Sequence, residues 1–359
     1  MTGVNVASTV GPPPGARLRL SSNESTFGTS PSAVAAMQAA VTEANLYPDD
    51  QSIDLRQAIA AHEGVGLAQV AVGNGSAAML MNLVAHQLRD GGSVVAYERG
   101  FIVYRVAARN LGVDYLEAPT GGPAEGDRDG YGRDPLALLA TVRADTKVVF
   151  IDNPGNPTGA HLTGEELRAV VEAMPEHVTV VVDEAYHQFA AGQRGYQTAS
   201  ELGLEHPRLM VSRTFSKAYA LAGQRVGYLT SENVDLVAEL DGWRARFNVT
   251  TSGQAGAIAA MADTAHLAET VRRSLAGRDQ MVAGLRKLGV PCTDGLGNFV
   301  TLECPANAGP LVEAFFDRHG VGVRPLMPYG MTDQIRVSVG NQQEVSDFLE
   351  AAQDVLVQR

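Results

Sequence analysis

Two stretches decide the fold of this chain: KVVFIDNPGNPTG at residues 147–159 and VTVVVDEAY at residues 178–186. Each begins with a run of apolar, mostly β-branched residues that leads into a carboxylate, Asp152 or Asp183. Continuous apolar runs separated by a helical pattern, here at 165–174, are typical of strands buried on both faces of a parallel sheet. The pattern therefore predicts an α/β fold with a mostly parallel sheet flanked by helices.

The same alternation continues on both sides of these stretches. It predicts further strands at 70–72, 93–97, 209–212 and 226–229, and helices at 79–88 and 101–111. After about residue 245 the spacing lengthens, with a helix at 252–288, strands at 298–303 and 334–339, and helices at 311–319 and 344–356. This change indicates a smaller α+β domain. We expect an N-terminal arm at 1–30, a large domain at 31–245 and a small domain at 246–359.

Composition excludes several classes of protein. The 359 residues include 40 acidic and 28 basic side chains, a net charge of −12, which argues against nucleic acid or an anionic membrane as the main partner. Two cysteines, Cys292 and Cys304, are too few for a disulfide scaffold and suit a reducing compartment. No apolar run is long enough to span a membrane, the N-terminus lacks the features of a signal peptide, and the eight histidines show no metal-ligand spacing. We therefore expect a cytoplasmic protein with no metal site.

Four strand ends carry residues that could bind or react with a ligand. Parallel α/β sheets bind ligands where their strands end, so these residues are expected at one edge. They are the turn at Gly73–Ser76, the rigid loop containing Asn156, the carboxylate of Asp183, and Lys217 beyond the strand at 209–212. Each alone also fits an ordinary turn, a capping residue or a surface lysine.

Together the four ends match the chemistry of one ligand. They offer a phosphate cradle at a helix start, an amide donor, an anion for a protonated ring nitrogen and an amine nucleophile. Pyridoxal 5′-phosphate (PLP) uses all four, with a lysine Schiff base and an aspartate at the ring nitrogen. We therefore expect PLP as the cofactor.

The chain resembles the aspartate-aminotransferase-like PLP enzymes of fold type I, and within them the histidinol-phosphate aminotransferase group. The segments that carry the resemblance run in family order from residue 18 to about residue 350 and are LSSNESTFG at 20–28, YPD at 47–49, GNGS at 73–76, NPTG at 156–159, DEAY at 183–186, RTFSKAY at 213–219, LAGQRVGY at 221–228, NFV at 298–300 and QIRVSVG at 334–340.

The resemblance implies a role for each matching position. The catalytic residues would be Lys217, which forms the Schiff base and moves the proton, and Asp183, which binds the pyridinium. The remaining cofactor contacts would come from Ser76, Ala77, Phe101, Asn156, Tyr186, Thr214, Ser216, Arg225 and, across a homodimer interface with shared active sites, Tyr47. Substrate contacts would come from Asn23 and Phe27 in an arm that closes over the site, from Arg324, and from Arg336, which would hold the α-carboxylate.

Some positions depart from the histidinol-phosphate pattern and put the substrate in question. Ala77 and Ala78 stand where that group usually has Asp-Glu, and they resemble the actinobacterial aromatic (phenylalanine) aminotransferases, as does the segment Asn23–Gly28. Gly155 replaces the usual Asn of the loop, and Arg246 replaces a usual Pro. The main expectation is an aminotransferase that acts on an aromatic amino acid and a 2-oxo acid.

Three alternatives stay open at this stage. The first is histidinol-phosphate aminotransferase, and the second is a different PLP enzyme on the same fold, such as a decarboxylase, aldolase or lyase of secondary metabolism. The third, a PLP-binding regulator, would usually need an added DNA-binding segment. About 20 residues before Asn23 in an acidic chain provide none.

Overall fold

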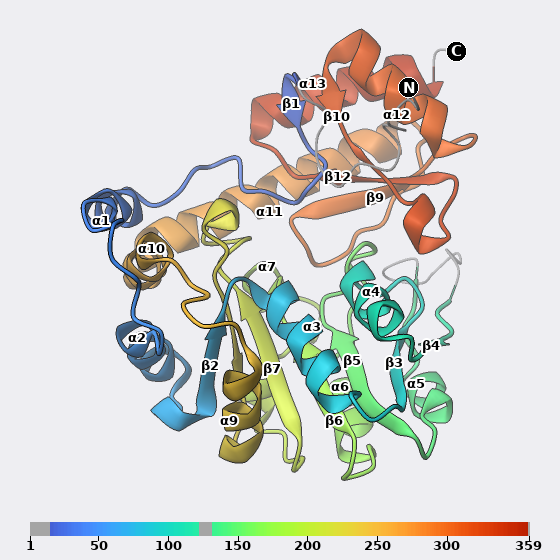
Figure 1. Cartoon of the computed structure of the whole chain (residues 1–359). Coiled ribbons are helices and arrows are strands. Elements are labelled where there is room, and N and C mark those ends of the chain that lie inside the picture. The colour runs from blue at the N-terminus through green and yellow to red at the C-terminus, as the bar shows by residue number, and fades with distance from the viewer. Residues whose placement is uncertain (1–14, 122–130, 358–359) are drawn as a thin grey trace, which may run out of the picture.

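The computed structural model describes residues 15–121 and 131–357, and a sheet of seven strands dominates these ranges (Figure 1). The strand order is β2-β8-β7-β6-β5-β3-β4. The strands are β2 (Val70–Gly73), β3 (Ser93–Tyr97), β4 (Asp114–Ala118), β5 (Thr146–Asp152), β6 (Thr179–Asp183), β7 (Leu209–Thr214) and β8 (Gly227–Thr230). Strand β8 runs antiparallel to β2 and β7, and the other pairs are parallel. The mostly parallel α/β sheet expected from the sequence is confirmed.

Strand β5 shows why the central run Val148–Ile151 is apolar throughout. Val148 and Phe150 pack into the core on one face, whereas Val149 and Ile151 pack into the core on the other. Because successive side chains of a strand point to opposite faces, a strand with helices on both sides needs apolar residues at every position. The first face is covered by α3 (Ser76–Gln87), α4 (Ile102–Leu111) and α9 (Val234–Trp243), and the second by α5 (Pro135–Thr141), α6 (Gly164–Glu172) and the short α8 (Ala199–Leu202).

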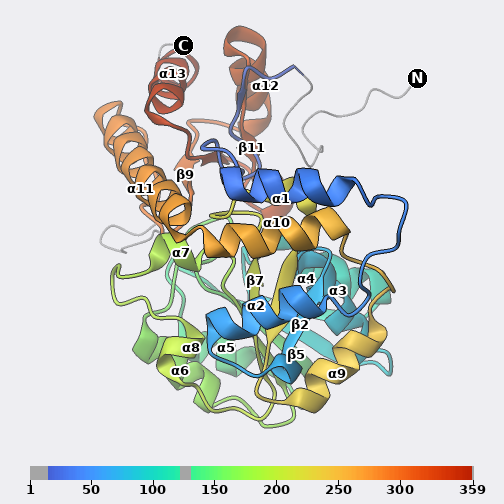
Figure 2. The same cartoon turned by 90° about the vertical axis from the view of Figure 1, so that its left-hand side faces the viewer.

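Three further helices pack beside the β2 and β8 end of the sheet. They are α1 (Pro31–Val41), α2 (Ile53–Glu63) and α10 (Thr251–Ala262), with α1 and α10 side by side in Figure 2. Ala33, Ile59 and Ala257 share one buried cluster with strand residues. The division expected at residue 245 stays a prediction, and the packing of α10 in this cluster favours a boundary further along the chain.

The C-terminal part forms a smaller layer above the sheet (Figure 1). Its three-stranded antiparallel sheet has the order β11-β12-β9 and consists of β9 (Phe299–Glu303), β11 (Arg324–Pro325) and β12 (Gln334–Ser338). The helices α11 (Thr264–Lys287), α12 (Ala308–His319) and α13 (Gln342–Ala352) pack with it around a core that contains Phe315 and Phe348. The N-terminal strand β1 (Leu18–Arg19) joins this layer by pairing with β10 (Val321–Gly322).

Two local predictions were wrong for physical reasons. The helix expected at 252–288 is two helices, because the Asp263 carboxylate accepts a hydrogen bond from the His266 amide (3.1 Å) and thereby caps α11 as a new helix. Strand β4 has no counterpart among the predicted strands, because it lies at the sheet edge and its partly exposed sequence DYLEA lacks an apolar run. In the described part of the chain, no helix is long and apolar enough to cross a membrane.

Candidate active site

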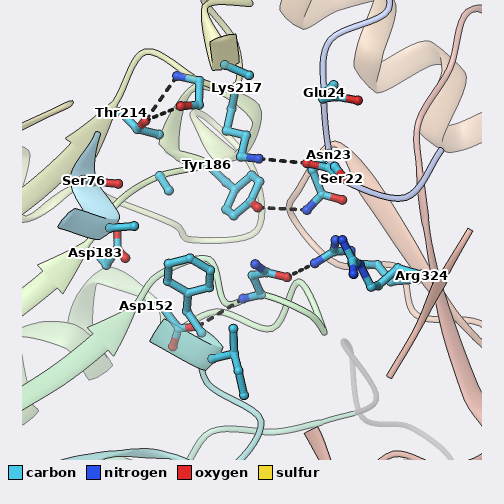
Figure 3. A pocket seen from close by; sticks show the side chains of 18 of the residues that line it. Ser22, Asn23, Glu24, Ser76, Asp152, Asp183, Tyr186, Thr214, Lys217 and Arg324 are labelled. Carbon is cyan, nitrogen blue, oxygen red and sulfur yellow. Dashed lines mark hydrogen bonds between the residues drawn. The ribbon is translucent and has the colours of Figure 1, made fainter. Parts of the chain in front are cut away.

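A cavity of about 600 Å³ lies where the carboxyl ends of the large sheet meet the small layer (Figure 3). It gathers thirteen of the fifteen residues that the sequence singled out, from segments as far apart as the N-terminal arm and β12: Asn23, Ser76, Ala77, Phe101, Asn156, Asp183, Tyr186, Thr214, Ser216, Lys217, Arg225, Arg324 and Arg336. The residues that follow strands of the large sheet lie together here, as expected for the carboxyl ends of parallel strands, and the arm and the small layer add Asn23, Arg324 and Arg336.

Asp183, the last residue of β6, has one paired and one unpaired carboxylate oxygen. Oδ2 accepts a hydrogen bond from the Tyr104 hydroxyl at 2.8 Å. Oδ1 is buried and has no hydrogen-bond partner within the described residues. Burial raises the pKa of this carboxyl to about 7. A buried anionic oxygen without a partner is costly, so the site is suited to a ligand that brings a cationic N–H donor to Oδ1.

Lys217 reaches the same cavity from the segment after β7. Its Nζ donates to the Ser22 carbonyl at 3.1 Å and lies 5.8 Å from the centre of the Tyr186 ring. Burial, followed by the positive charge of Arg336, lowers the pKa of this amine to about 7. A large share of the amine is therefore unprotonated near neutral pH, which is the form required for attack on an aldehyde.

A candidate anion site lies where the segments that follow β2 and β7 meet at the cavity. Helix α3 begins at Ser76 after Gly75, which has a φ of 95° and no side-chain cap, so the first amides of α3 face the cavity edge without a capping side chain. A Cβ atom at Gly75 would lie 2.6 Å from Nη2 of Arg225. Glycine thus permits the close approach of this guanidinium, and its positive φ favours glycine as well. Thr214 and Ser216 add hydroxyl groups that are 3.0 Å apart.

Two arginines occupy the opposite end of the cavity. Arg324 and Arg336 are cross-strand partners on β11 and β12, and both donate to the Ser21 carbonyl, from Nε at 3.2 Å and from Nη2 at 2.9 Å. Arg336 also donates to Oδ1 of Asn156, and its buried Nε has no hydrogen-bond partner among the residues described. An unpaired guanidinium N–H in a cavity suits a carboxylate or phosphate group of a ligand.

Two predicted site residues are outside the cavity of this single chain. The Tyr47 side chain is exposed and stacks on Phe247, with ring centres 4.6 Å apart. Phe27 lies beneath the guanidinium of Arg273, which is 4.4 Å from its ring centre. The expected contact of Tyr47 with a partner subunit and that of Phe27 with substrate stay predictions.

Sequence reasoning missed two buried residues at the site. Tyr104, which binds Asp183, lies one helical turn beyond Phe101, and the i, i+3 spacing on α4 was a usable signal. Asp152 ends β5 just as Asp183 ends β6, and the two are cross-strand partners. The apolar run that pointed to Asp183 therefore pointed equally to Asp152, which lines the cavity.

Asp152 explains the unusual Gly155 of the loop. Its carboxylate accepts from the Asn156 amide at 3.1 Å and pairs with Arg133 at 2.8 Å. Arg133 is almost completely buried, and a Cβ atom at position 155 would overlap its guanidinium. The buried pair Arg133–Asp152 thus requires glycine at position 155 and fixes the amide of Asn156.

Gly155→Asn should destabilise the apo-protein by about 2–3 kcal/mol, because the new side chain must displace the Arg133 guanidinium from its buried partner. In an Arg133→Ala background the same substitution should cost less than about 1 kcal/mol of unfolding free energy. Urea unfolding of wild type, the two single variants and the double variant measures this coupling between positions 133 and 155. Gly242→Ala is the matched control, since a Cβ atom there meets nothing within 4 Å. Equal costs in both backgrounds would contradict this explanation.

Comparisons with known proteins agree with this geometry. Residues 17–351 match the model of the family described as aminotransferase class I and II. The chain is 41% identical to histidinol-phosphate aminotransferase 2 of Methylococcus capsulatus, covering 95% of this chain and 90% of that protein, and 39% identical to its namesake from Pseudomonas fluorescens, covering 96% and 90%. It superposes with a TM-score of 0.86 and 29% identity on the histidinol-phosphate aminotransferase of Sinorhizobium meliloti, solved with pyridoxal 5′-phosphate, covering 96% of this chain and 92% of that one.

The residues present fit that cofactor on structural grounds. The unpaired Oδ1 of Asp183 suits a pyridinium N–H, the amine of Lys217 suits an aldehyde, and the uncapped start of α3 beside Arg225 suits a phosphate. Among the described residues, no group of three or more His, Cys, Asp or Glu side chains is placed to hold a metal ion. The chain therefore belongs to the aminotransferase class I and II family and is a PLP-dependent transaminase of fold type I.

Proposed function

We propose that this transaminase transfers an amino group between histidinol phosphate and a 2-oxo acid. The observation that carries the proposal is the arginine cluster of Arg324 and Arg336, whose side chains both donate to the Ser21 carbonyl in the same cavity as Lys217. These side chains can bind the phosphate of one substrate and the carboxylates of the other. The names of the curated relatives support histidinol phosphate over the aromatic substrate that the sequence motifs favoured.

The roles of the site residues are part of this proposal. When bound, PLP supplies an aldehyde that takes up the amino group and a ring that withdraws electrons from the substrate α-carbon. Lys217 would hold the cofactor through its amine and would carry the α-proton of the substrate. Asp183 holds the proton on the ring nitrogen, Asn156 and Tyr186 bind the 3-oxygen, and Phe101 stacks on the ring. The phosphate is held by the hydroxyls of Ser76, Thr214 and Ser216, the Ala77 amide and Arg225.

Substrate recognition follows from the other end of the cavity. Arg336 offers its unpaired Nε to the anionic group of the substrate, and Arg324 lies beside it. Asn23 donates to the Tyr186 hydroxyl at 2.9 Å and so links the N-terminal arm to the cofactor site. The two arginines and the arm together close the substrate end of the cavity.

An aromatic amino acid is the second candidate substrate. Ala77 lines the cavity, and the segment Asn23–Gly28 supports this candidate as well. The same arginines would then bind the α-carboxylate.

With 2-oxoglutarate as acceptor, kcat/KM for L-histidinol phosphate should exceed that for L-phenylalanine by at least about tenfold. The physical reason is that a phosphate dianion gains more from the arginine cluster than a carboxylate does. Initial rates with each donor, measured at the same acceptor concentration, give the ratio. A ratio below one would replace the proposed substrate by the aromatic one.

We also propose a homodimer in which Tyr47 reaches the phosphate site of the partner subunit. Its side chain is 82% exposed, and Val41, Leu46 and Phe247 beside it in sequence or structure are exposed as well. Exposed apolar groups in one region are typical of an interface. Asp50 fixes this region, because its carboxylate accepts from the Phe247 amide and from Arg246, each at 2.6 Å. Arg246, which replaces the usual Pro, thus holds the loop through its ion pair with Asp50.

Mixing Lys217→Ala protein with Tyr47→Ala protein should restore activity that neither variant has alone. In a mixed dimer, one site combines an intact Lys217 with an intact Tyr47, so random exchange of subunits should give about a quarter of wild-type activity. The assay is run after unfolding and refolding the two proteins together at limiting PLP, and each variant refolded alone is the control. Activity equal to the mean of the separate variants would contradict shared sites.

A further inference from the structure

Tyr104 is buried directly behind the cofactor-facing residues of the cavity. It has no exposed surface, and its hydroxyl donates to Oδ2 of Asp183 at 2.8 Å. The other carboxylate oxygen, Oδ1, has no partner in the described ranges. The phenol therefore occupies one oxygen and leaves the second available to a ligand.

Two aromatic contacts fix the position of this phenol. The Tyr104 ring stacks on Phe150, with ring centres 4.1 Å apart and planes within 3°. It also lies perpendicular to Phe101, with ring centres 5.7 Å apart. Phe101 lines the cavity, so one side chain supports both the carboxylate expected at the ring nitrogen and the ring expected against the cofactor face.

The groups that face Asp183 explain what the hydrogen bond does to its charge. Burial and the neighbouring Asp152 raise the pKa of Asp183, whereas the hydrogen bond from Tyr104 on α4 and the nearby polar groups of Ser212 on β7 and the Ala185 amide lower it. The bond from Tyr104 is the largest of these lowering effects. Because burial and then the adjacent Asp183 carboxylate raise the pKa of the Tyr104 phenol, Tyr104 stays protonated and remains a donor.

We propose that Tyr104 is a positioning residue that acts through Asp183. By binding Oδ2 it favours the ionised carboxylate and leaves Oδ1 available to the pyridine nitrogen of PLP, while its ring supports Phe101. The proposal rests on the proposed contact between Asp183 and that nitrogen. It predicts an effect that depends on the nitrogen itself, which a merely structural tyrosine would not have.

The test compares Tyr104→Phe with Tyr97→Phe, a matched control. Tyr97 is also fully buried, but its hydroxyl donates to the backbone carbonyl of Asp134 at 3.1 Å. The dissociation constant of PLP should rise about tenfold in Tyr104→Phe, the size expected for loss of one hydrogen bond to a charged group, and stay unchanged in the control. In steady-state assays, kcat should fall by a similar factor with little change in KM.

A cofactor analogue in which CH replaces the ring nitrogen separates positioning from packing. Wild-type protein should bind this analogue more weakly than PLP, and Tyr104→Phe should bind it with the wild-type affinity, because the analogue gives Oδ1 no N–H donor. If Tyr104→Phe weakened the binding of PLP and of the analogue by the same factor, Tyr104 would act only through packing. Unchanged PLP affinity in Tyr104→Phe would overturn the proposal as well.

A second comparison distinguishes loss of the Tyr104 hydrogen bond from a folding defect in Tyr104→Phe, and from an error in the proposed role of Asp183. In an Asp183→Asn background, which removes the buried charge, adding Tyr104→Phe should leave PLP affinity unchanged. A further tenfold loss there would overturn the proposal. If wild-type protein binds both cofactors equally, the contact between Asp183 and the ring nitrogen is absent, and the assigned role of Asp183 fails together with this inference. Retention of the wild-type preference in Tyr104→Phe overturns the inference alone.

Discussion

Lys217→Ala should lower kcat by about 10⁴-fold or more, because no other amine in the described cavity can take over both covalent attachment and proton transfer. The variant should still fold and hold PLP non-covalently through Asp183 and the phosphate site. Steady-state assays with excess PLP measure the loss, and thermal unfolding checks the fold.

The matched controls for this substitution are the two other lysines of the chain, Lys147 and Lys287. Both are exposed, Lys147 near the start of β5 and Lys287 at the end of α11, and neither lines the cavity. Their alanine variants should keep wild-type rates. A Lys217→Ala enzyme within tenfold of wild type would remove this residue from the chemistry.

Asp183→Ala should slow removal of the α-proton by about 10³-fold, because the carboxylate is the group that holds a proton on the ring nitrogen. Rapid-mixing measurements of a single half-reaction, with α-deuterated donor to identify the proton step, give this rate. Asp183→Glu keeps the charge and should retain more activity. A wild-type rate in the alanine variant would contradict the assignment.

The raised pKa of Asp183 predicts that the stability of the apo-protein depends on pH. Its pKa is near 3.8 when unfolded and about 7 when folded, so the folded state holds the proton more tightly between these values. The free energy of unfolding should therefore fall as pH rises from about 4 to about 7, and the fall should be smaller in Asp183→Asn. Urea unfolding across this range measures both curves. Parallel curves for the two proteins would show that Asp183 is not the titrating group.

Much of the fold was predictable because this sheet is covered on both faces. The central positions of strands such as β3 and β5 then need apolar residues on both faces, which gives an unbroken run in the sequence. Edge strand β4 is covered less completely and leaves no such run. The break at Asp263 depends on a cap in which the Ser30 hydroxyl also bonds the carboxylate, and this contact across 233 residues has no local signal.

The candidate site was predictable in its parts and not in its connections. Residues at the strand ends, such as Asp183 and Lys217, could be found because strand ends of a parallel sheet meet at one edge. The pairing of Arg133 with Asp152, and of Tyr104 with Asp183, joins separate elements through buried side chains. Tyr47 was singled out only through the family resemblance, and its contact with a partner subunit stays a prediction, because within a single chain its side chain is exposed and outside the cavity.

The most direct test is to find which lysine carries the cofactor. The chain has three candidates, Lys147, Lys217 and Lys287, and only Lys217 lines the cavity. Borohydride reduction of the holoenzyme fixes the covalent link, and mass spectrometry of proteolytic peptides then locates the added pyridoxyl group. We expect one pyridoxyl group per chain, on the peptide that contains Lys217. Lys217→Ala protein treated with borohydride in the same way should lose its cofactor on dialysis. Stoichiometric label on Lys147 or Lys287 would place the active site elsewhere and contradict this expectation.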